Sequence, residues 1–176
     1  MVGFYRFFAY MLFFFMMLIV FLPKENLYFA VEKELKKDGV ILYSETIQED
    51  PFSLDIQGSI VNFQTIDIAK VAHIEIGLYG FYNTFDAQDI QLYTFSKNFL
   101  PSKIKYLRAT YLLFDPLHIK IMAEGEFGIL EGQYNIKEHL LKVTIQPSKK
   151  MLQEYQNSLG LLKKLKNGEY SYETTL

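Results

Sequence analysis

The stretch L-H-I-K-I-M-A, residues 117–123, alternates apolar and polar side chains and indicates how most of the chain folds. In an extended strand the apolar residues at odd positions fall on one side, and His118 and Lys120 fall on the other. A period of two with one apolar side is typical of an antiparallel sheet that buries one face and wets the other. This stretch is therefore predicted to be one strand of such a sheet.

Seven further stretches rich in β-branched and aromatic residues follow the same pattern. They are Val40–Ile47, Ser53–Phe63, Ile66–Ile76, Ala87–Tyr93, Lys103–Tyr111, Gly128–Ile136 and Leu141–Gln146. They succeed one another at roughly ten-residue spacing without intervening helices, which argues against alternating strand–helix folds. The sequence predicts a mainly β fold built on a meandering antiparallel sheet, open or folded on itself.

A short helix is predicted before the strands, over Pro23–Asp38. Pro23 suits the first turn of a helix, and Gly39 suits a left-handed cap after the last turn. Apolar residues at four-residue steps form one stripe, so we interpret the segment as a juxtamembrane helix that packs on the domain. The alternative is a helix that lies on a membrane surface.

A second helix is predicted near the C-terminal end, over Ser148–Lys166. Ser148 is a good N-cap, and Leu152, Tyr155 and Leu159 recur at three- and four-residue steps. The segment Glu169–Glu173, with two tyrosines on one side, is predicted to be a last short strand.

The segment Phe7–Leu22, FFAYMLFFFMMLIVFL, contains no charged residue. A helix rises about 1.5 Å per residue, so about 20 residues cross a bilayer core of about 30 Å. Sixteen residues suffice if Arg6 reaches back to the headgroups. Cleavage after Ala30 would place Tyr28 at the −3 position, where a small residue is needed, so a retained signal anchor is favoured over a cleaved signal peptide.

These segments divide the chain into a transmembrane signal anchor (residues 1–22), a juxtamembrane helix (23–39) and a β-rich domain (40–176). Two arguments on orientation disagree. Lysines after the anchor, such as Lys24 and Lys33, favour an orientation in which the C-terminal domain is in the cytoplasm. A short N-terminal tail before a large domain favours the opposite orientation, which we adopt, with the domain outside the cytoplasm.

Composition and motifs indicate a protein that is not an enzyme and needs no cofactor. The absence of cysteine excludes disulfides, thiolate metal sites and a cysteine nucleophile. The 18 basic and 20 acidic residues are balanced without a basic patch, so no nucleic-acid partner is expected. His73 and Glu75 would share a strand face, which leaves a two-ligand metal site as an alternative to a solvated histidine. No nucleotide-binding or hydrolase motif is present.

The segment Gly77–Asp86, GLYGFYNTFD, is predicted to be a loop because it contains two glycines and Asn83. Its large apolar residues would be costly to leave in water, so they either fold back on the core or contact lipid or a partner. The candidate contact residues are Leu78, Tyr79, Phe81, Tyr82 and Phe85.

The order of motifs after residue 124 resembles the closing segment of type II secretion system protein N and its AsmA-like relatives. The residues concerned are Gly125-Glu126-Phe127-Gly128, Glu131-Gly132-Gln133-Tyr134-Asn135, Gln146-Pro147-Ser148 and Asn167-Gly168-Glu169-Tyr170-Ser171-Tyr172. The resemblance implies a single-pass protein of the bacterial inner membrane with a periplasmic sheet curled into a groove or taco-like shape. It also implies a role in a secretion apparatus or in lipid movement between membranes, and it carries over no catalytic residue.

Three functions are compatible with the sequence. The first is a non-enzymatic bitopic inner-membrane protein, part of a protein secretion system or envelope assembly, whose sheet edge pairs with other envelope proteins. The second is a lipid-binding or lipid-bridging protein that uses an apolar groove in the sheet. The third, a membrane-tethered hydrolase, requires a catalytic cluster that the sequence does not suggest. An open apolar trough in the sheet would favour the second.

Overall fold

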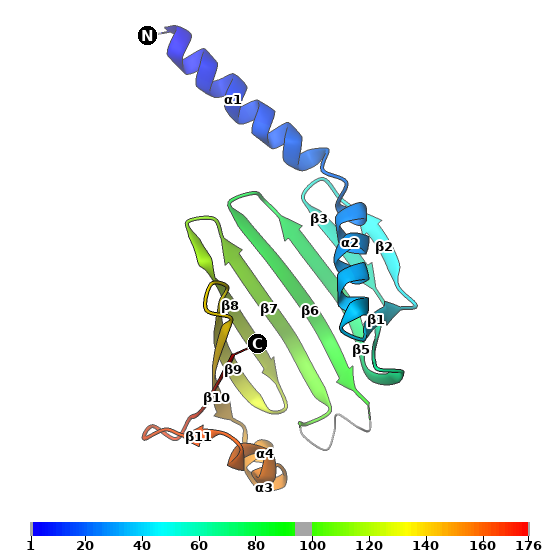
Figure 1. Cartoon of the computed structure of the whole chain (residues 1–176), viewed down its shortest axis with the longest axis vertical. Coiled ribbons are helices and arrows are strands. Elements are labelled where there is room, and N and C mark those ends of the chain that lie inside the picture. Colours follow the sequence, from blue (N-terminus) through cyan, green and yellow to red (C-terminus); the bar gives the residue numbers. More distant parts are fainter. Residues whose placement is uncertain (1, 94–99, 176) are drawn as a thin grey trace.

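The chain folds into one curved antiparallel sheet with helices before it and near its end (Figure 1). The structure is a computed structural model that describes residues 2–93 and 100–175. The helices are α1 (Val2–Val20), α2 (Lys24–Lys37), α3 (Lys149–Glu154) and α4 (Gln156–Gly160). The strands are β1 (Val40–Tyr43), β2 (Thr46–Glu49), β3 (Ser53–Gln57), β4 (Ile60–Phe63), β5 (Ile66–Leu78), β6 (Tyr82–Leu92), β7 (Lys103–Leu112), β8 (Asp115–Gly125), β9 (Gly128–Asn135), β10 (Leu140–Pro147), β11 (Lys163–Lys164) and β12 (Tyr170–Thr175).

The sheet contains 12 strands within the described residues, in the order β1-β4-β5-β6-β7-β8-β9-β10-β12-β11. From β4 to β10 each strand pairs with the next one along the chain. Strands β3 and β4 both pair with β5, and β2 pairs with β3. All pairs of described strands are antiparallel, which confirms the expected antiparallel sheet. The meander holds from β4 to β10, whereas β1 pairs with β4, β3 with β5 and β10 with β12.

The two faces of the sheet differ in polarity, as the alternation in the sequence predicts. Ile121 of β8 lies opposite Ala109 of β7 on one face. On the other face, the next residue, Lys120, lies opposite Thr110 of β7 and Gln133 of β9. Opposed residues of an antiparallel pair share a face, so apolar residues of successive strands line up on one side of the sheet.

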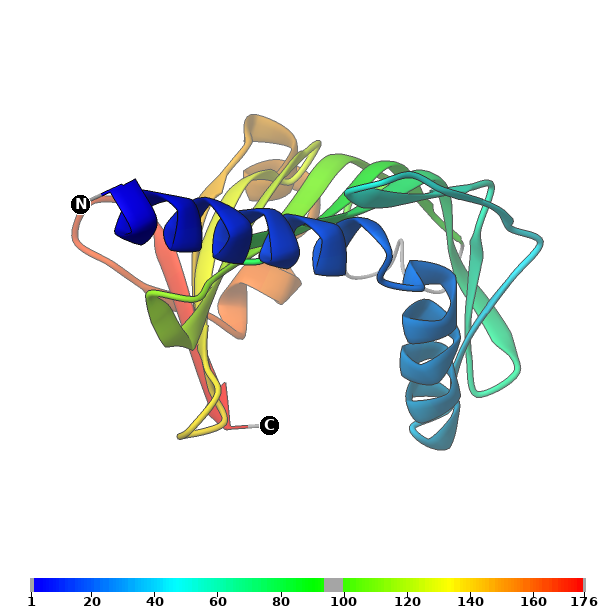
Figure 2. The same ribbon diagram turned by 90° about the horizontal axis from the view of Figure 1, so that it is seen from above.

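Helix α2 packs on the apolar face near β3 and β5. Its Tyr28 belongs to a buried cluster with Leu54, Ile56 and Ile74. The Tyr28 hydroxyl donates a hydrogen bond to Glu45 at 2.8 Å, and burial together with this acceptor raises the pKa of Tyr28 well above its usual range. Figure 2 shows α2 inside the curve of the sheet, so the apolar face is the concave one. The expected helix over 23–38 is confirmed.

Helices α3 and α4 cover the apolar face at the end farthest from α1 (Figure 1). Met151 and Leu159 are buried there against Ala123 and Phe127. The two helices therefore close one end of the concave face, as α2 closes one side.

The sheet bends at a point where the alternation of buried and exposed residues along β5 and β6 shifts by one residue. In β5 the buried positions pass from Val71 to Ile74, and in β6 from Ile90 to Ala87. Asp89, between the two positions in β6, has φ of 50°, in the left-handed region. Irregularities of this kind increase strand twist and curvature, which gives the sheet its arched shape (Figure 2).

Four predicted segments differ from the structure. Val40–Ile47 and Ser53–Phe63 were each expected to form one strand, but each is split in two by a turn. The turns have left-handed residues at Ser44, with φ of 64°, and at Gly58, with φ of 77°. The expected loop over 77–86 is wrong, because β5 continues to Leu78 and β6 begins at Tyr82. The expected single helix over 148–166 is also wrong. Ser148 does cap α3 by accepting a hydrogen bond from the Met151 N–H at 3.1 Å, but the helix stops before Tyr155, whose φ of −123° is not helical. The chain then forms α4 and the short strand β11.

Taken singly, the helices among the described residues are too short or too polar to cross a membrane. Helices α1 and α2 together have the length and composition for it, but they are bent by 56° at the break between them.

Candidate functional site

Large apolar side chains occupy the turns at the end of the sheet that lies nearest to the C-terminal end of α1; Figure 1 shows this end of the sheet. We call these residues the apolar rim: Phe52, Tyr79, Phe81, Leu113 and Phe114. Phe81 is 60% exposed and Phe114 is 86% exposed. Their turns are tied together through the backbone, because the Leu113 N–H donates to the Phe81 carbonyl at 3.0 Å. The exposed rings are therefore held on a fixed framework.

Stacked rings stiffen one side of the apolar rim. The rings of Phe52 and Tyr79 lie 6.3 Å apart at 18°, and those of Tyr79 and Tyr82 lie 6.2 Å apart at 29°. The Leu78 N–H also donates to the Phe52 carbonyl at 2.7 Å, which joins the β2–β3 turn to the end of β5.

Helix α1 crosses in front of the apolar rim with most of its surface uncovered (Figure 2). Every residue from 4 to 16 is exposed, and all of them except Arg6 are apolar or aromatic. Helix and rim meet closely at Gly80, where an added Cβ would lie 2.9 Å from Ile19 Cδ1. Gly80 also has φ of 85°, so the turn needs glycine for its backbone as well as for this contact.

A cavity of about 690 Å³ lies between α1 and the apolar rim, and we call it the rim pocket. One face of α1 lines it, from Leu12 to Ile19, together with Leu22 after the helix and rim residues from three turns. The lining is almost entirely apolar. Pockets that bind small ligands have volumes of about 300–1,000 Å³. The rim pocket is therefore large enough for an apolar ligand.

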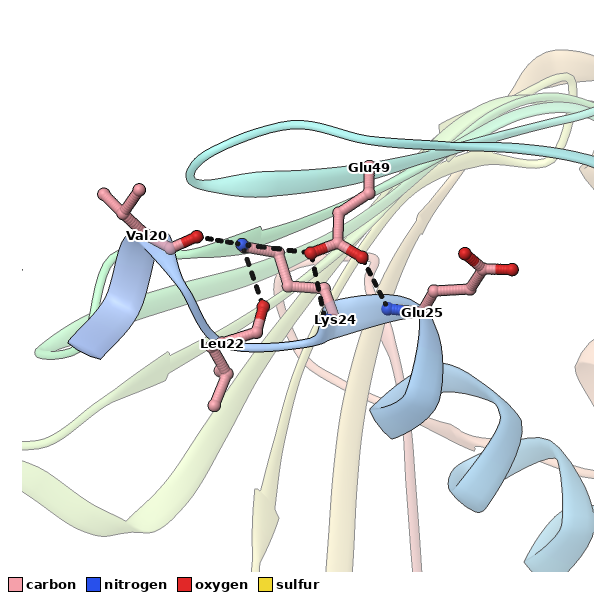
Figure 3. Close-up of polar contacts among 5 residues, drawn as sticks. All are labelled: Val20, Leu22, Lys24, Glu25 and Glu49. Atoms are coloured by element: carbon pink, nitrogen blue, oxygen red, sulfur yellow. Dashed lines mark hydrogen bonds and ion pairs between the residues drawn. The ribbon is translucent and has the colours of Figure 1, made fainter. Parts of the chain in front are cut away.

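The junction of α1 and α2 is held by a buried lysine (Figure 3). Lys24 is 2% exposed, and its Nζ donates to the carbonyls of Val20 at 3.4 Å and Leu22 at 3.2 Å. The same Nζ lies 3.7 Å from the Glu49 carboxylate. Glu49 in turn accepts hydrogen bonds from the N–H groups of Lys24 at 3.3 Å and Glu25 at 3.4 Å.

Lys24 and Glu49 together provide hydrogen-bond partners for the carbonyl end of α1 and the N–H end of α2. The ammonium of Lys24 lies at the carbonyl end of α1, and the carboxylate of Glu49 lies at the N–H end of α2. Each charge has the sign that complements the dipole of the helix end it faces. Because Glu49 belongs to β2, the junction also ties both helices to the sheet.

The concave face between α2 and α3–α4 is apolar and partly exposed. Phe85 of β6 is 37% exposed, and Tyr172 of β12 is 44% exposed. Between them Ile119, Tyr134 and Val143 are half-buried, although each lies on the apolar side of the sheet. A filled core would bury such residues almost completely, so this part of the face is open.

The convex face carries cross-strand ion pairs. Asp86 pairs with Arg108, and this hydrogen bond raises the pKa of the Arg108 guanidinium. Lys105 lies 3.3 Å from Glu124, and Lys142 lies 3.4 Å from Glu173. These are partly exposed pairs of the kind that keep a sheet face soluble.

The three histidines belong to separate polar pairs. His73 Nε2 lies 2.7 Å from Asp55, His118 Nδ1 lies 2.7 Å from Asp115, and Tyr134 contacts His139 at 3.2 Å. Within residues 2–93 and 100–175, no three acidic or histidine side chains are close enough to hold a metal ion. His73 and Glu75 lie on the polar face, where Asp55 is the partner of His73.

The structure separates the five candidate contact residues of the sequence. Tyr79 and Phe81 belong to the apolar rim, Phe85 lies on the open concave face, and Leu78 is half-buried at the end of β5. Tyr82 shares the polar face, since it lies two residues from Thr84 and four from Asp86 along β6.

Several residues of the site were missed from the sequence. The run Leu112-Leu113-Phe114 before Asp115-Pro116 was a usable signal, because large apolar residues in a turn need a contact. Lys24 offered a second signal. A lysine in the first turn of a helix opposes the helix dipole, so its position indicated a partner elsewhere.

Comparison of the chain with protein-family models, with curated proteins and with solved structures finds no match.

Proposed function

We propose that this chain is a membrane-anchored, non-enzymatic protein that binds lipid acyl chains on the concave face of its sheet. The observation that carries the proposal is the open part of that face, where Phe85, Ile119, Tyr134, Val143 and Tyr172 remain partly exposed. Apolar chains would remove this surface from water at a gain of about 25 cal/mol per Å². The convex face carries solvated ion pairs instead, so it is suited to contact with water rather than with acyl chains.

The anchor in this proposal is α1. Burying one large apolar side chain is worth about 1.5–3 kcal/mol, and α1 exposes a dozen of them. A lipid bilayer covers all sides of such a helix, whereas a protein surface covers one. The apolar rim lies at the same end of the sheet and would rest at the membrane surface, where aromatic rings are favoured.

The proposed location is the bacterial inner membrane, crossed once, with the β domain in the periplasm. It is supported by the resemblance of residues 125–172 to AsmA-like envelope proteins. The chain contains no cysteine, so Asn167→Cys would provide a single thiol on the exposed β11–β12 connection. A membrane-impermeant maleimide should label it in cells whose outer membrane alone is permeabilised. Labelling only after lysis would place the domain in the cytoplasm.

The lipid proposal is tested with neighbouring positions on opposite faces of β8. Ile121 lies on the concave face, and Met122 lies on the convex face with 42% of its surface exposed. A photoreactive benzoylphenylalanine replaces Ile121, Met122 or, on the concave face of β6, Phe85. Mass spectrometry of the protein irradiated in membranes should show phospholipid or lipopolysaccharide adducts at Ile121 and Phe85. Equal yields at Met122, or no lipid adduct at Phe85, would contradict the proposal.

A second function is favoured by one edge of the sheet. Strand β11 pairs only with Tyr170 and Ser171 of β12, so residues 172–175 have no neighbouring strand on that side within the described chain. A strand from another envelope or secretion-system protein could add there. Benzoylphenylalanine in place of the exposed Thr175 should then form one protein adduct of discrete mass. Adducts with lipid alone would argue against this second function.

A further inference from the structure

We propose that the rim pocket holds one acyl chain of a membrane phospholipid, which enters sideways from the bilayer between α1 and the hairpin turns. This inference rests on the anchoring of α1 proposed above and assigns the ligand of a second site on the same molecule. It does not depend on whether lipid also reaches the concave face.

The shape of the pocket fits a chain that comes from the bilayer. One wall is α1 itself, through Leu12, Phe15 and Ile19 at helical spacing. The opposite wall is made by Gly80 and by the apolar rim without Phe114. A lipid beside α1 in the membrane would already be in contact with the first wall, so moving one chain into the pocket exposes no apolar surface to water.

The junction keeps the pocket from closing. Helix α1 touches the rim at Ile19 and Gly80, and Lys24 fixes its last turn through two carbonyls and Glu49. The opposite wall is stiffened by the stacked rings of Phe52 and Tyr79. A concave, mostly apolar site with fixed walls is suited to an apolar ligand.

The lining favours an acyl chain over a peptide. The turn N–H groups of Tyr79, Phe81 and Leu113 already donate to carbonyls of the turns, at 3.2, 3.2 and 3.0 Å. These three N–H groups are therefore not available to pair with a peptide strand. A transmembrane helix of a partner would need small residues for close approach, and the α1 residues that face the pocket are all large.

The chain offers a clean background for the test, because it contains neither cysteine nor tryptophan. The pair Ile19→Cys and Gly80→Cys places two thiols at the closest contact between α1 and the rim. Because φ at Gly80 is 85°, the single variant Gly80→Cys is included to show that the domain still folds with a side chain at this turn. Oxidation should form the disulfide in the membrane-embedded protein, and the control pair Val20→Cys and Gly80→Cys should form much less of it.

Tryptophan is then introduced into the locked protein at Phe15, which faces the pocket, or at Phe14, which does not. The protein is placed in vesicles of phosphatidylethanolamine and phosphatidylglycerol whose acyl chains carry bromine, a contact quencher of tryptophan. We expect nearly equal quenching of Phe15→Trp and Phe14→Trp, because lipid chains fill the pocket as well as surround the helix.

Two results would overturn the inference. Quenching of Phe15→Trp at less than half that of Phe14→Trp would mean that protein, either the closed rim or a partner helix, fills the pocket. Failure of the Ile19–Gly80 disulfide to form above the control would mean that α1 leaves the rim and that no pocket exists in the membrane. Adducts at Ile121 and Phe85 report on the concave face independently, so the two proposals fail separately.

Discussion

Replacing Lys24 by methionine tests whether the junction holds α1 in place. Methionine keeps an unbranched apolar stem but removes the ammonium. The two carbonyl contacts, at 3.2 and 3.4 Å, are long for hydrogen bonds to a charged donor, which are worth about 1.5–3 kcal/mol each. The Glu49 side chain is 35% exposed, so water can solvate its charge, and the cost is below that of a fully buried pair. We therefore expect a loss of about 2–3 kcal/mol.

Because the junction is local, the loss is best measured by amide hydrogen exchange. The N–H groups of Lys24 and Glu25 are bonded to Glu49, so they exchange when the junction opens. A loss of 2–3 kcal/mol corresponds to exchange roughly 30- to 150-fold faster at Glu25 in Lys24→Met, at about 1.4 kcal/mol per tenfold. The exposed Lys33 on the same helix supplies the control, since Lys33→Met should change this rate less than about threefold.

The pairing with Glu49 is isolated by a double-mutant cycle. Glu49→Gln keeps an oxygen acceptor for the α2 N–H groups but removes the charge. The effects of Lys24→Met and Glu49→Gln should be less than additive, by about 1 kcal/mol, because each removes the same interaction. If Lys24→Met exchanges within threefold of the unaltered protein, then Lys24 does not fix α1, and the account of the junction is wrong.

Three further predictions concern the sheet and its caps. The hydrogen bond to Asp67 raises the pKa of Tyr43 to about 12 and lowers that of Asp67. The contribution of Tyr43 is therefore complete below about pH 10 and lost as pH rises through 12, while that of Asp67 is complete above about pH 4 and lost on acidification. A ¹³C NMR titration that places Tyr43 at its ordinary value, or leaves Asp67 unchanged in Tyr43→Phe, would exclude this bond. Gly128→Ala should lower the free energy of unfolding in urea by about 3 kcal/mol or more, because φ is 119° and the added Cβ would lie 2.0 Å from a carbonyl oxygen of β10. Gly160→Ala is the control. Its added Cβ meets nothing within 4 Å, so this variant should be neutral or stabilising by up to about 1 kcal/mol. Ser148→Ala should cost about 1 kcal/mol through loss of the α3 cap, and an unchanged unfolding midpoint would show that the cap is dispensable.

The strands were predictable because one face of the sheet must be dry and the other wet. That requirement imposes a period of two on strands such as β8, where Ile121 and Lys120 point to opposite faces. The order of strands from β4 to β10 followed as well, since short connections between successive strands favour a meander. The pairing of β1 with β4 and of β3 with β5 did not follow from it. The curvature did not follow, because it depends on irregular backbone positions such as Asp89, which no residue type marks.

Glycine misled the prediction at residues 77–86. Gly80 does serve a turn, with φ of 85°. Gly77 instead lies inside β5, where an added Cβ would meet Thr84 Oγ1 and Tyr79 Cε2 at 2.7 Å each. One glycine provides backbone freedom and the other provides space, and the sequence alone does not distinguish the two.

The apolar stripe of residues 148–166 fits a single helix, yet the chain leaves the helical path at Tyr155. Leu159 reaches the core from a second short helix, so a helical period in the sequence did not require one continuous helix. The partner of Lys24 was equally hidden, since Glu49 lies 25 residues away and is brought near by the folding of β2. Contacts of this kind are set by tertiary packing, which local patterns do not encode.

The up-and-down order of β5 to β10 makes the width of the sheet adjustable. Each added hairpin would insert two strands, widening the sheet by about 10 Å at the usual strand spacing, with one turn at each end. The α2 edge and the β12 edge would remain as they are, as would the junction at Lys24. Duplication of hairpins could therefore widen the concave face while the junction that joins α1, α2 and β2 stays unchanged.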